Sequence, residues 1–487
     1  MKMVFDINSS DKRHFLYTLS FFLFTFFPLL TVGYYLYDDM GRSMDGYFRW
    51  SNDGRIISDI IFKVLMLGGP IHDISPLPQI LAIATMSVTP IFLSRTFPKL
   101  TTFQSVISSI LLFSTPFYLG NMSYVYDALP MSVSILFSLI ALLSISKNLN
   151  FISCICASIF LFLSLSTYQA SFNVFIVLFI ATILAENRFN IIRAVIGAMA
   201  MIISLVTYKL SILFYNIGDY QTPHSNMASL NNMASAIFDN IYSCYSYLIK
   251  ILTYNSVYAF IFSAALLVFI VVIIRVRKWN YAGLSLMLIA LMTLAVPGIQ
   301  LILQSPVFSA RTMMGVGAVF CGLSGVAFSS AKTNIENRVL SSFSIALICC
   351  FVVISYGQAA YLRNVKLHQQ DYIGRIAYQI NRLADEKGAS SVSIIGHQTY
   401  PLSLNHSLET AGFLKSINPP PVFENGWWSF RTLQLYGLNP SLQIVKKKRA
   451  EICPLIRSGT STDPLGYQIL AKDNTVVLVF NGACPPR

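Results

Sequence analysis

Long apolar segments separated by short connections constrain the fold of this chain more than any other feature. Of its 487 residues, 55% are hydrophobic and only 11% are charged, whereas soluble domains carry about 25% charged residues. A helix of about 20 apolar residues crosses a bilayer, so the sequence predicts a polytopic α-helical membrane protein. We predict about eleven transmembrane helices, near residues 15–36, 75–94, 100–119, 129–146, 150–168, 170–185, 194–215, 256–274, 282–303, 312–330 and 340–358.

Basic residues predict how these helices are oriented. Lys and Arg collect in the cytoplasmic loops of membrane proteins. With eleven spans, thirteen basic residues fall on one side of the membrane and six on the other. We therefore predict a cytoplasmic N-terminus and an external C-terminal region, and we attribute the net charge of +13 to topology rather than to a nucleic-acid partner. The thirteen are Lys2, Lys12, Arg13, Arg95, Lys99, Lys147, Arg188, Arg193, Arg275, Arg277, Lys278, Lys332 and Arg338; the six are Arg42, Arg49, Arg55, Lys63, Lys250 and Arg311.

The apolar run 150–185 leaves two arrangements open, because the sequence TYQAS interrupts it. Two short spans keep the alternation of charge between connections, whereas a re-entrant pair of helices is the alternative. Tyr168 and Gln169, at this interruption, either face a cavity or simply form the turn.

The first external connection, 37–74, begins with the sequence YDDMGR directly after the first span. It then continues into RIISDIIFKVLML, in which apolar residues recur at helical spacing while Asp59 and Lys63 lie four residues apart on the other face. This segment is too short to cross the bilayer. It predicts an amphipathic helix at about 56–67 that lies on the membrane interface.

Residues 359–487 differ in character from the preceding transmembrane region, 1–358, because they contain more charge, Pro and Gly and shorter apolar runs. We predict a small external α/β domain there. Its expected elements are a helix with Val365, Tyr372, Ile376, Ile380 and Leu383 on one face, and strands at 392–397, 441–445 and 467–480, the last divided by a KDN turn.

Two features of this C-terminal domain leave alternatives open. Cys453 and Cys484 are its only cysteines; such a pair bridges or stays free in an oxidising compartment, and the spacing does not decide between the two. The pair Trp427–Trp428 fits a sugar-stacking platform, a membrane-interface anchor or a core position.

The predicted topology restricts where chemistry takes place. Every predicted cytoplasmic connection is short, and the sequence contains no GxxxxGK[ST] motif, so no nucleotide-binding domain fits on that side. An enzyme acting on the external side would take its substrate from the lipid. A lipid-phosphate-linked sugar needs positive charge for its leaving phosphate, which Arg42, Arg55 or Arg311 can supply.

An acceptor hydroxyl also needs a general base, and a partly desolvated carboxylate at the membrane boundary suits that role. Asp38 and Asp39 are the candidates. We expect an extended or turn backbone here, so that the two side chains point in different directions and have two roles. The simpler alternative is that they are solvated residues at a helix end.

The block YDDMGRSMDGYFRWSNDGRIISDII resembles the first external loop of bacteriophage-associated, serotype-converting O-antigen glucosyltransferases of the type II family, which belong to the GT-C superfamily. The layout of the whole chain is also similar to that plan. The residues that match the DD-x-x-R … W … GR pattern are Asp38, Asp39, Arg42, Trp50, Gly54 and Arg55.

The resemblance implies transfer of glucose from undecaprenyl phosphate glucose, with inversion, to lipopolysaccharide O-antigen or its lipid-linked precursor. It also implies a multi-pass protein of the bacterial inner membrane with a periplasmic C-terminal domain. By analogy Asp38 is the favoured base and Asp39 orients the substrate, and Trp50 joins the arginines as a substrate-binding candidate. Some GT-C relatives need a divalent metal, but the pattern here provides no convincing set of ligands.

Two other functions fit the same topology. A flippase or transporter of a lipid-linked saccharide would carry ionisable groups in mid-membrane or discontinuous helices in paired halves; the best intramembrane charge, Lys209, lies close enough to the external end to snorkel. An O-antigen polymerase would use a lipid-linked oligosaccharide donor instead.

Further candidate residues lie in other external loops, and each has a simpler structural alternative. His224 is a candidate phosphate or sugar ligand or a structural histidine. Asp127 contacts the acceptor sugar or serves as an acidic residue at a helix N-terminus. The acceptor sugar and the linkage position depend on loop packing and stay open.

Overall fold

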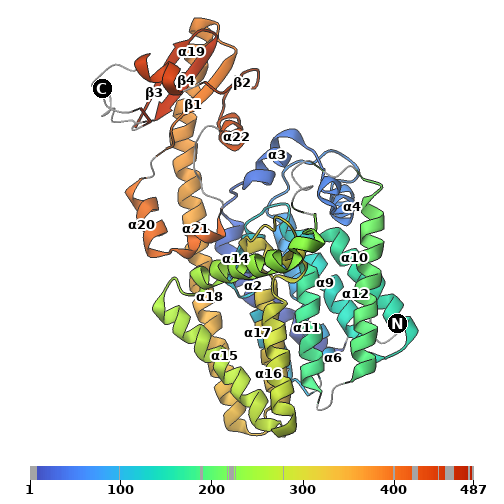
Figure 1. Ribbon diagram of the computed structural model, residues 1–487. Coiled ribbons are helices and arrows are strands. Elements are labelled where there is room, and N and C mark those ends of the chain that lie inside the picture. The colour runs from blue at the N-terminus through green and yellow to red at the C-terminus, as the bar shows by residue number, and fades with distance from the viewer. Residues whose placement is uncertain are drawn as a thin grey trace. The chain divides into compact units, whose positions relative to one another are not determined.

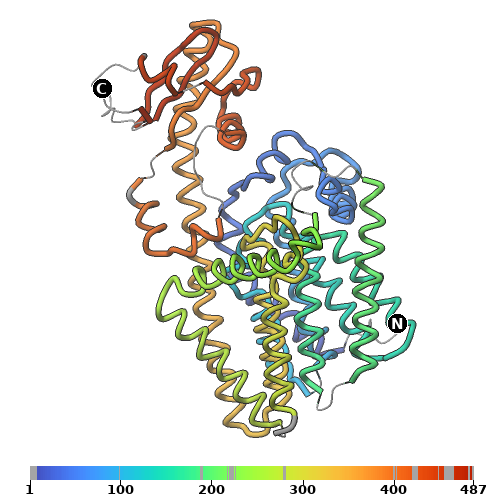
Figure 2. Tube along the Cα trace, viewed as in Figure 1, coloured from blue at the N-terminus to red at the C-terminus, as the bar shows by residue number. Residues whose placement is uncertain are grey.

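The computed structural model describes residues 8–97, 99–186, 190–215, 218, 224, 226–277, 279–398, 401–418, 426–447, 449–455, 466–480 and 483–484 (Figures 1 and 2). The chain divides into two compact units. We call Met1–Gly33, Tyr47–Ala359 and Ala411–Ile417 the helical unit, and Tyr34–Gly46, Ala360–Thr410 and Asn418–Arg487 the sheet unit. The predicted division at residue 358 stays a prediction about domains. The sheet unit also includes the short segment Tyr34–Gly46, which contains YDDMGR.

The helical unit consists of helices joined by short turns. Polar side chains define where several of them begin: Asn8 and Asp11 form a capping box at α2, and Thr101 and Gln104 form another at α7. Its α-helices are α2 (Ser9–Leu30), α4 (Ile56–Leu65), α5 (Leu77–Met86), α6 (Thr89–Thr96), α7 (Thr102–Phe113), α8 (Pro116–Met122), α9 (Ala128–Lys147), α10 (Phe151–Thr167), α11 (Ser171–Ala185), α12 (Ile191–Ile212), α14 (Met233–Leu252), α15 (Ser256–Val276), α16 (Trp279–Leu294), α17 (Gly315–Ser330), α21 (Phe413–Ile417) and most of α18 (Asn334–His368). Its 3₁₀ turns are η1 (Ser51–Asp53), η2 (Leu230–Asn232), η3 (Gly298–Ile302) and η4 (Ala310–Thr312).

Each predicted span overlaps a helix or a pair of helices, and the prediction of a polytopic helical protein is confirmed. Within the described residues, six helices are long and apolar enough to cross a membrane, and α7 with α8, bent by 73°, makes a seventh candidate. Pro116 explains this bend, because proline cannot donate the backbone hydrogen bond that a continuous helix requires. The count of eleven spans and the GT-C plan stay predictions. Shorter apolar helices cover Phe151–Thr167, Ser171–Ala185, Tyr281–Leu294 and Gly315–Ser330.

Buried hydroxyl groups join three helices inside the helical unit. The Ser164 hydroxyl, on α10, hydrogen-bonds to those of Ser138 on α9 (2.9 Å) and Ser171 on α11 (2.6 Å). Small polar residues allow helices to approach closely where the surroundings are apolar. The run 150–185 is thus two helices that share polar contacts at their common turn, which is compatible with both arrangements expected from the sequence.

The sheet unit contains a four-stranded sheet in the order β2-β1-β4-β3, in which β1 runs parallel to both neighbours and β3 antiparallel to β4. The strands β1 and β4 are buried along their whole length. The strands lie within a few residues of the predicted positions, which confirms that prediction. The alternative that the sequence left open for the two cysteines is decided as well, because Cys453 is disulfide-bonded to Cys484. The strands are β1 (Ser391–Ile395), β2 (Gln443–Ile444), β3 (Tyr467–Lys472) and β4 (Thr475–Phe480).

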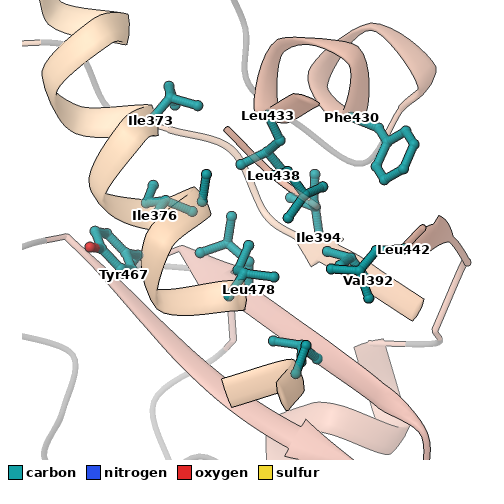
Figure 3. Close-up of a cluster of buried hydrophobic side chains, with 14 of the residues drawn as sticks. Ile373, Ile376, Val392, Ile394, Phe430, Leu433, Leu438, Leu442, Tyr467 and Leu478 are labelled. Atoms are coloured by element: carbon teal, nitrogen blue, oxygen red, sulfur yellow. The ribbon is translucent and has the colours of Figure 1, made fainter. Parts of the chain in front are cut away.

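Helices cover one face of this sheet. Ile376 and Ile380 of α19 are fully buried against sheet residues such as Val392, and Leu433 of α22 joins the same cluster (Figure 3). The helices of the sheet unit are α3 (Tyr37–Asp45), α19 (Gly374–Lys387), α20 (Leu402–Thr410), α22 (Trp427–Leu435) and α23 (Arg449–Ile452), with a π-turn at Gln369–Ile373 and the 3₁₀ turn η6 (Cys453–Leu455).

The structure corrects two expectations about the first predicted external loop. YDDMGR was expected to be extended or a turn, but it begins the helix α3. The carboxylates of Asp38 and Asp39, in the first turn, interact favourably with the positive end of the helix dipole, and Gly46 ends the helix with φ +66°. The helix predicted at 56–67 is present as α4, with Ile60 and Val64 exposed, and its location on the membrane interface stays a prediction. However, Asp59 was expected on the solvated face and is instead buried. The connection between the predicted spans 194–215 and 256–274 contains the helix α14.

Candidate functional site

A buried carboxylate, Asp127, organises the candidate site in the helical unit. It lies at the N-terminus of α9 and is 1% exposed, yet its side chain does not cap that helix. One carboxylate oxygen accepts a hydrogen bond from the indole of Trp50 at 2.5 Å, and the other lies 3.7 Å from a guanidinium nitrogen of Arg55. Asp127 therefore connects the first predicted external loop with the start of a transmembrane helix.

The loop that carries Trp50 and Arg55 is held by an aromatic stack and by two hydrogen bonds to a buried carboxylate. The fully buried Trp50 ring stacks on Phe62 of α4, with ring centroids 4.6 Å apart. The two carboxylate oxygens of Asp59 accept the backbone N–H groups of Trp50 and Ser51, both at 2.9 Å. This explains why Asp59 faces inward: it satisfies backbone donors that would otherwise be buried without partners.

A glycine allows the same loop to approach a neighbouring helix closely. Gly54 has φ +72°, and a Cβ atom there would lie 2.5 Å from the Tyr208 hydroxyl of α12. The Gln169 amide donates to the Asp53 carbonyl and to the Tyr208 hydroxyl, both at 2.8 Å. Gln169 therefore does more than form the turn after α10, because it holds the loop that presents Arg55.

Two arginines predicted to bind phosphate are linked in this cluster through one tyrosine. The Arg55 guanidinium lies 4.7 Å from the centre of the Tyr168 ring, and the Tyr168 hydroxyl donates to the Arg311 carbonyl at 3.1 Å. The Arg311 guanidinium in turn lies 4.8 Å from the centre of the Tyr124 ring. Each guanidinium is thus placed over an aromatic face. Guanidinium N–H groups are well suited to bind an oxyanion.

Arg55 has unused hydrogen-bonding capacity. The residue is 9% exposed, and its buried Nε–H has no hydrogen-bond partner among the described residues. The 3.7 Å between the Arg55 guanidinium nitrogen and the Asp127 carboxylate oxygen is longer than a hydrogen bond. A buried cation that is balanced by a carboxylate but not saturated with acceptors is suited to receive an anionic ligand.

The predicted base candidates lie in the sheet unit, on α3. Asp39 is fully buried, Arg42 is 3% exposed and Asp38 is half-buried. Successive helical residues are about 100° apart, so the two aspartates point in different directions, as expected, although on a helix rather than on a turn. The predicted site residues are therefore divided between the units: Trp50, Arg55, His224 and Arg311 belong to the helical unit.

His224 and Trp427–Trp428 have contacts that bear on their alternatives. A ring nitrogen of His224 hydrogen-bonds to the Ser305 carbonyl at 2.7 Å, which gives it a structural contact. The Trp428 ring stacks on Tyr37 of α3, whereas Trp427 is exposed and lies beside the Arg431 guanidinium.

The sequence did not single out Tyr124 at all, and for Asp127 and Tyr168 it left structural alternatives. The signal that was available is the segment SYVYD at 123–127, where aromatic residues and an acid precede a transmembrane helix. Within the described part of the chain, no group of three or more His, Cys, Asp or Glu side chains is arranged to hold a metal ion.

Comparison with known proteins bears directly on this site. The sequence model of the family described as Glucosyl transferase GtrII matches residues 12–321, which include α3, the Trp50–Arg55 loop, Asp127 and Arg311. The chain is also 27% identical, over 496 residues, to a protein of Salmonella phage P22 described as an uncharacterized 55.3 kDa protein in the gtrB 5′ region; the match covers 97% of this chain and 99% of that protein. No solved structure matches the chain significantly. Because the family match covers well over half of the sequence, the chain belongs to the GtrII glucosyl transferase family.

Proposed function

We propose that this family member transfers glucose from undecaprenyl phosphate glucose to the O-antigen of lipopolysaccharide, or to its lipid-linked precursor, on the periplasmic side of the bacterial inner membrane. Family membership supports glucosyl transfer, and the apolar helices support a lipid-borne donor. The observation that carries the proposal furthest is the buried, incompletely hydrogen-bonded Arg55 in the Asp127 cluster.

The leaving group of the donor is a lipid phosphate, and Arg55 is the residue we assign to it. The cation–π contact with Tyr168 holds the Arg55 guanidinium in place, and Asp127 balances its charge before the substrate arrives. Donors that are already oriented in a poorly solvated site stabilise developing negative charge at little reorganisation cost. Arg311, fixed by Tyr124 and joined to the cluster through Tyr168, is the second phosphate ligand.

The acceptor hydroxyl is deprotonated by an aspartate of α3. Asp38 is half-buried and so is able to contact a water-borne acceptor sugar, whereas the fully buried Asp39 is better suited to orient its surroundings. We therefore assign the base to Asp38 and an orienting role to Asp39. The proton of the acceptor hydroxyl passes to Asp38, the hydroxyl oxygen bonds to the anomeric carbon, and the lipid phosphate leaves; we assign inversion to this transfer, as the resemblance implies.

Mass spectrometry of lipopolysaccharide tests this proposal in a host that makes polyprenyl phosphate glucose. The expected product gains one hexose per acceptor unit only when the protein is present, and no longer does so in a host that lacks the prenyl-linked donor. Asp38→Asn should abolish the gain. Arg55→Lys should reduce it by about 10²-fold, because Lys keeps the charge but loses the planar donors.

Several outcomes contradict the proposal. Full activity in both Asp38→Asn and Asp39→Asn would exclude the aspartate base. Glucose transfer that continues without the prenyl-linked donor would exclude the donor. Longer O-antigen chains with no added hexose would indicate a polymerase instead, and saccharide movement without any new glycosidic bond would indicate a transporter.

A further inference from the structure

The helix α3 packs against α22, although the two are far apart in the sequence (Figure 1). At the start of α3, the Tyr37 ring stacks on Trp428, with centroids 5.0 Å apart and planes inclined by 26°. At its end, a carboxylate oxygen of Asp45 lies 2.5 Å from a guanidinium nitrogen of Arg431. Contacts at both ends fix the position of α3 along its own axis as well as its rotation about that axis.

A third contact lies between these two. The Thr432 hydroxyl, on α22, donates to the sulfur of Met40 at 3.6 Å. Met40 is buried, and it directly follows the two aspartates in the sequence. The residues that contact α22 thus flank Asp38 and Asp39 on both sides along the chain.

The α22 side of this contact is itself anchored. The Arg431 guanidinium donates to the Gln434 side chain at 2.8 Å and lies over the Trp427 ring at 5.6 Å. On the same helix, Phe430 and Leu433 are buried in the hydrophobic core that covers the sheet (Figure 3). An arginine held by a neighbour, on a helix fixed by core residues, holds its carboxylate partner in one place.

The segment before α3 has a further connection within the sheet unit. The Tyr34 side chain hydrogen-bonds to Gln369, in the π-turn between α18 and α19. The backbone that enters α3 and the helix itself are therefore both held by elements that lie after residue 360. A local role for α3 in the first loop alone does not account for these contacts.

We propose that Arg431 and Trp428 are positioning residues for glucosyl transfer: together they form a clamp that holds α3 so that its aspartates meet the acceptor hydroxyl. This inference rests on the proposed function, because it takes Asp38 and Asp39 as the groups to be positioned. Both clamp residues lie outside the family match at 12–321, and Arg431 is 386 residues from Asp45. The C-terminal region thus contributes to the chemistry without contacting the reacting atoms.

Steady-state kinetics of the full-length protein in detergent, with polyprenyl phosphate glucose and an O-antigen acceptor, tests the clamp. Arg431→Ala and Asp45→Ala should each lower kcat by about 10–100-fold, because small displacements of a reacting group cost that much. The KM for the donor should not change, since neither residue binds it. The double variant should be no worse than either single variant, and the exchange Arg431→Asp with Asp45→Arg should recover part of kcat.

Two further variants separate positioning from folding. Trp428→Phe keeps an aromatic ring for Tyr37 and should retain most of kcat, whereas Trp428→Ala should not. Arg382→Ala is the matched control: Arg382 also lies in the sheet unit and pairs with Glu386 at 3.3 Å, but this pair is local to α19 and exposed. It should leave kcat and KM unchanged.

The inference is overturned if Arg431→Ala keeps full kcat, or if its loss matches only the fraction of unfolded protein and the charge exchange restores nothing. Hydrogen exchange of the α3 amides distinguishes failure of the positioning role from failure of the proposed function. If Asp38→Asn and Asp39→Asn both stay active, the proposed base is wrong. If instead Asp38→Asn and Asp39→Asn are inactive, and Arg431→Ala speeds hydrogen exchange of the α3 amides without lowering kcat, the clamp exists but has no positioning role.

Discussion

Two aspartate–arginine pairs, one from each unit, join distant parts of the chain in opposite ways. Asp127 and Arg55 are separated by 3.7 Å, with side chains 2% and 11% exposed. Asp45 and Arg431 are only 2.5 Å apart, although the Asp45 side chain is 50% exposed. The more buried pair is thus the less tightly bonded one.

This difference indicates what each pair is for. A buried ion pair has to offset the desolvation of both groups, and a longer separation offsets it less well. The Asp127–Arg55 pair therefore gives little stability by itself, which fits the proposed role of Arg55 as a ligand for the donor phosphate. The half-exposed pair has a small electrostatic energy but defined geometry, which suits a role in placing a helix.

The largest expected effect comes from removing the buried carboxylate. Asp127→Ala leaves the Arg55 charge buried without its partner and the Trp50 indole without its acceptor. We expect a loss of about 3–5 kcal/mol in the free energy of unfolding, measured by denaturant unfolding in detergent. Asp45→Ala, in the half-exposed pair, should lower the free energy of unfolding by about 1 kcal/mol or less.

Asp127→Asn is the control, because its amide oxygen still accepts from Trp50 and only the charge is lost. It should be more stable than Asp127→Ala. Equal unfolding free energies for Asp127→Ala and Asp45→Ala would show that burial does not distinguish the two pairs.

An intermediate effect should distinguish the loop of the buried pair from the sheet unit. Gly54 and Gly388 both end helical turns at positive φ, +72° and +62°. Gly→Ala at either position should lower the free energy of unfolding by about 1–2 kcal/mol, because alanine is strained in this backbone conformation. Only Gly54→Ala adds the contact with the Tyr208 hydroxyl, so it should be less stable and should also lose glucosyl transfer through displacement of Arg55.

Thermal unfolding and the transfer assay, run on both glycine variants, check this prediction. If Gly388→Ala proves as inactive as Gly54→Ala, the close approach to Tyr208 is not what fixes the loop.

The smallest expected effect is the response of the two pairs to salt. Raising the ionic strength from about 0.1 M to 1 M shortens the Debye length from about 10 to 3 Å. Double-mutant cycles at the two salt concentrations should show the Asp45–Arg431 coupling, about 0.2–1 kcal/mol at low salt, decreasing towards zero. The Asp127–Arg55 coupling should change less because salt screens a largely buried pair much less than an exposed one. An equal decrease in both couplings would contradict this.

Much of the fold was predictable from local patterns. Apolar runs located the helices, and alternation with turn residues located the strands, because both signals depend on neighbours in sequence. The helix at 56–65 was recognisable for the same reason. The state of YDDMGR was not, because α3 has no capping side chain and packs against a helix almost four hundred positions later.

The candidate site was predictable in its residue types but not in its grouping. The arginine and tryptophan of the first loop stood out by pattern, whereas their partner Asp127 lies 77 residues from Trp50. Asp59 was placed on the wrong face because helical spacing alone does not reveal the backbone donors that it accepts. Tyr124 was missed because its contact with Arg311, 187 residues later, cannot be read from the segment SYVYD alone.

The order in which the chain is made gives the packing of α3 on α22 a temporal meaning. Ribosomes add about 5–20 residues per second, and Arg431 follows Asp45 by 386 residues. The ribosome therefore reaches Arg431 roughly 20–80 seconds after it has completed α3. During that interval a nascent chain already holds its aspartates but lacks the surface that secures them. If these contacts position α3 as we propose, glucosyl transfer begins only after translation has passed α22.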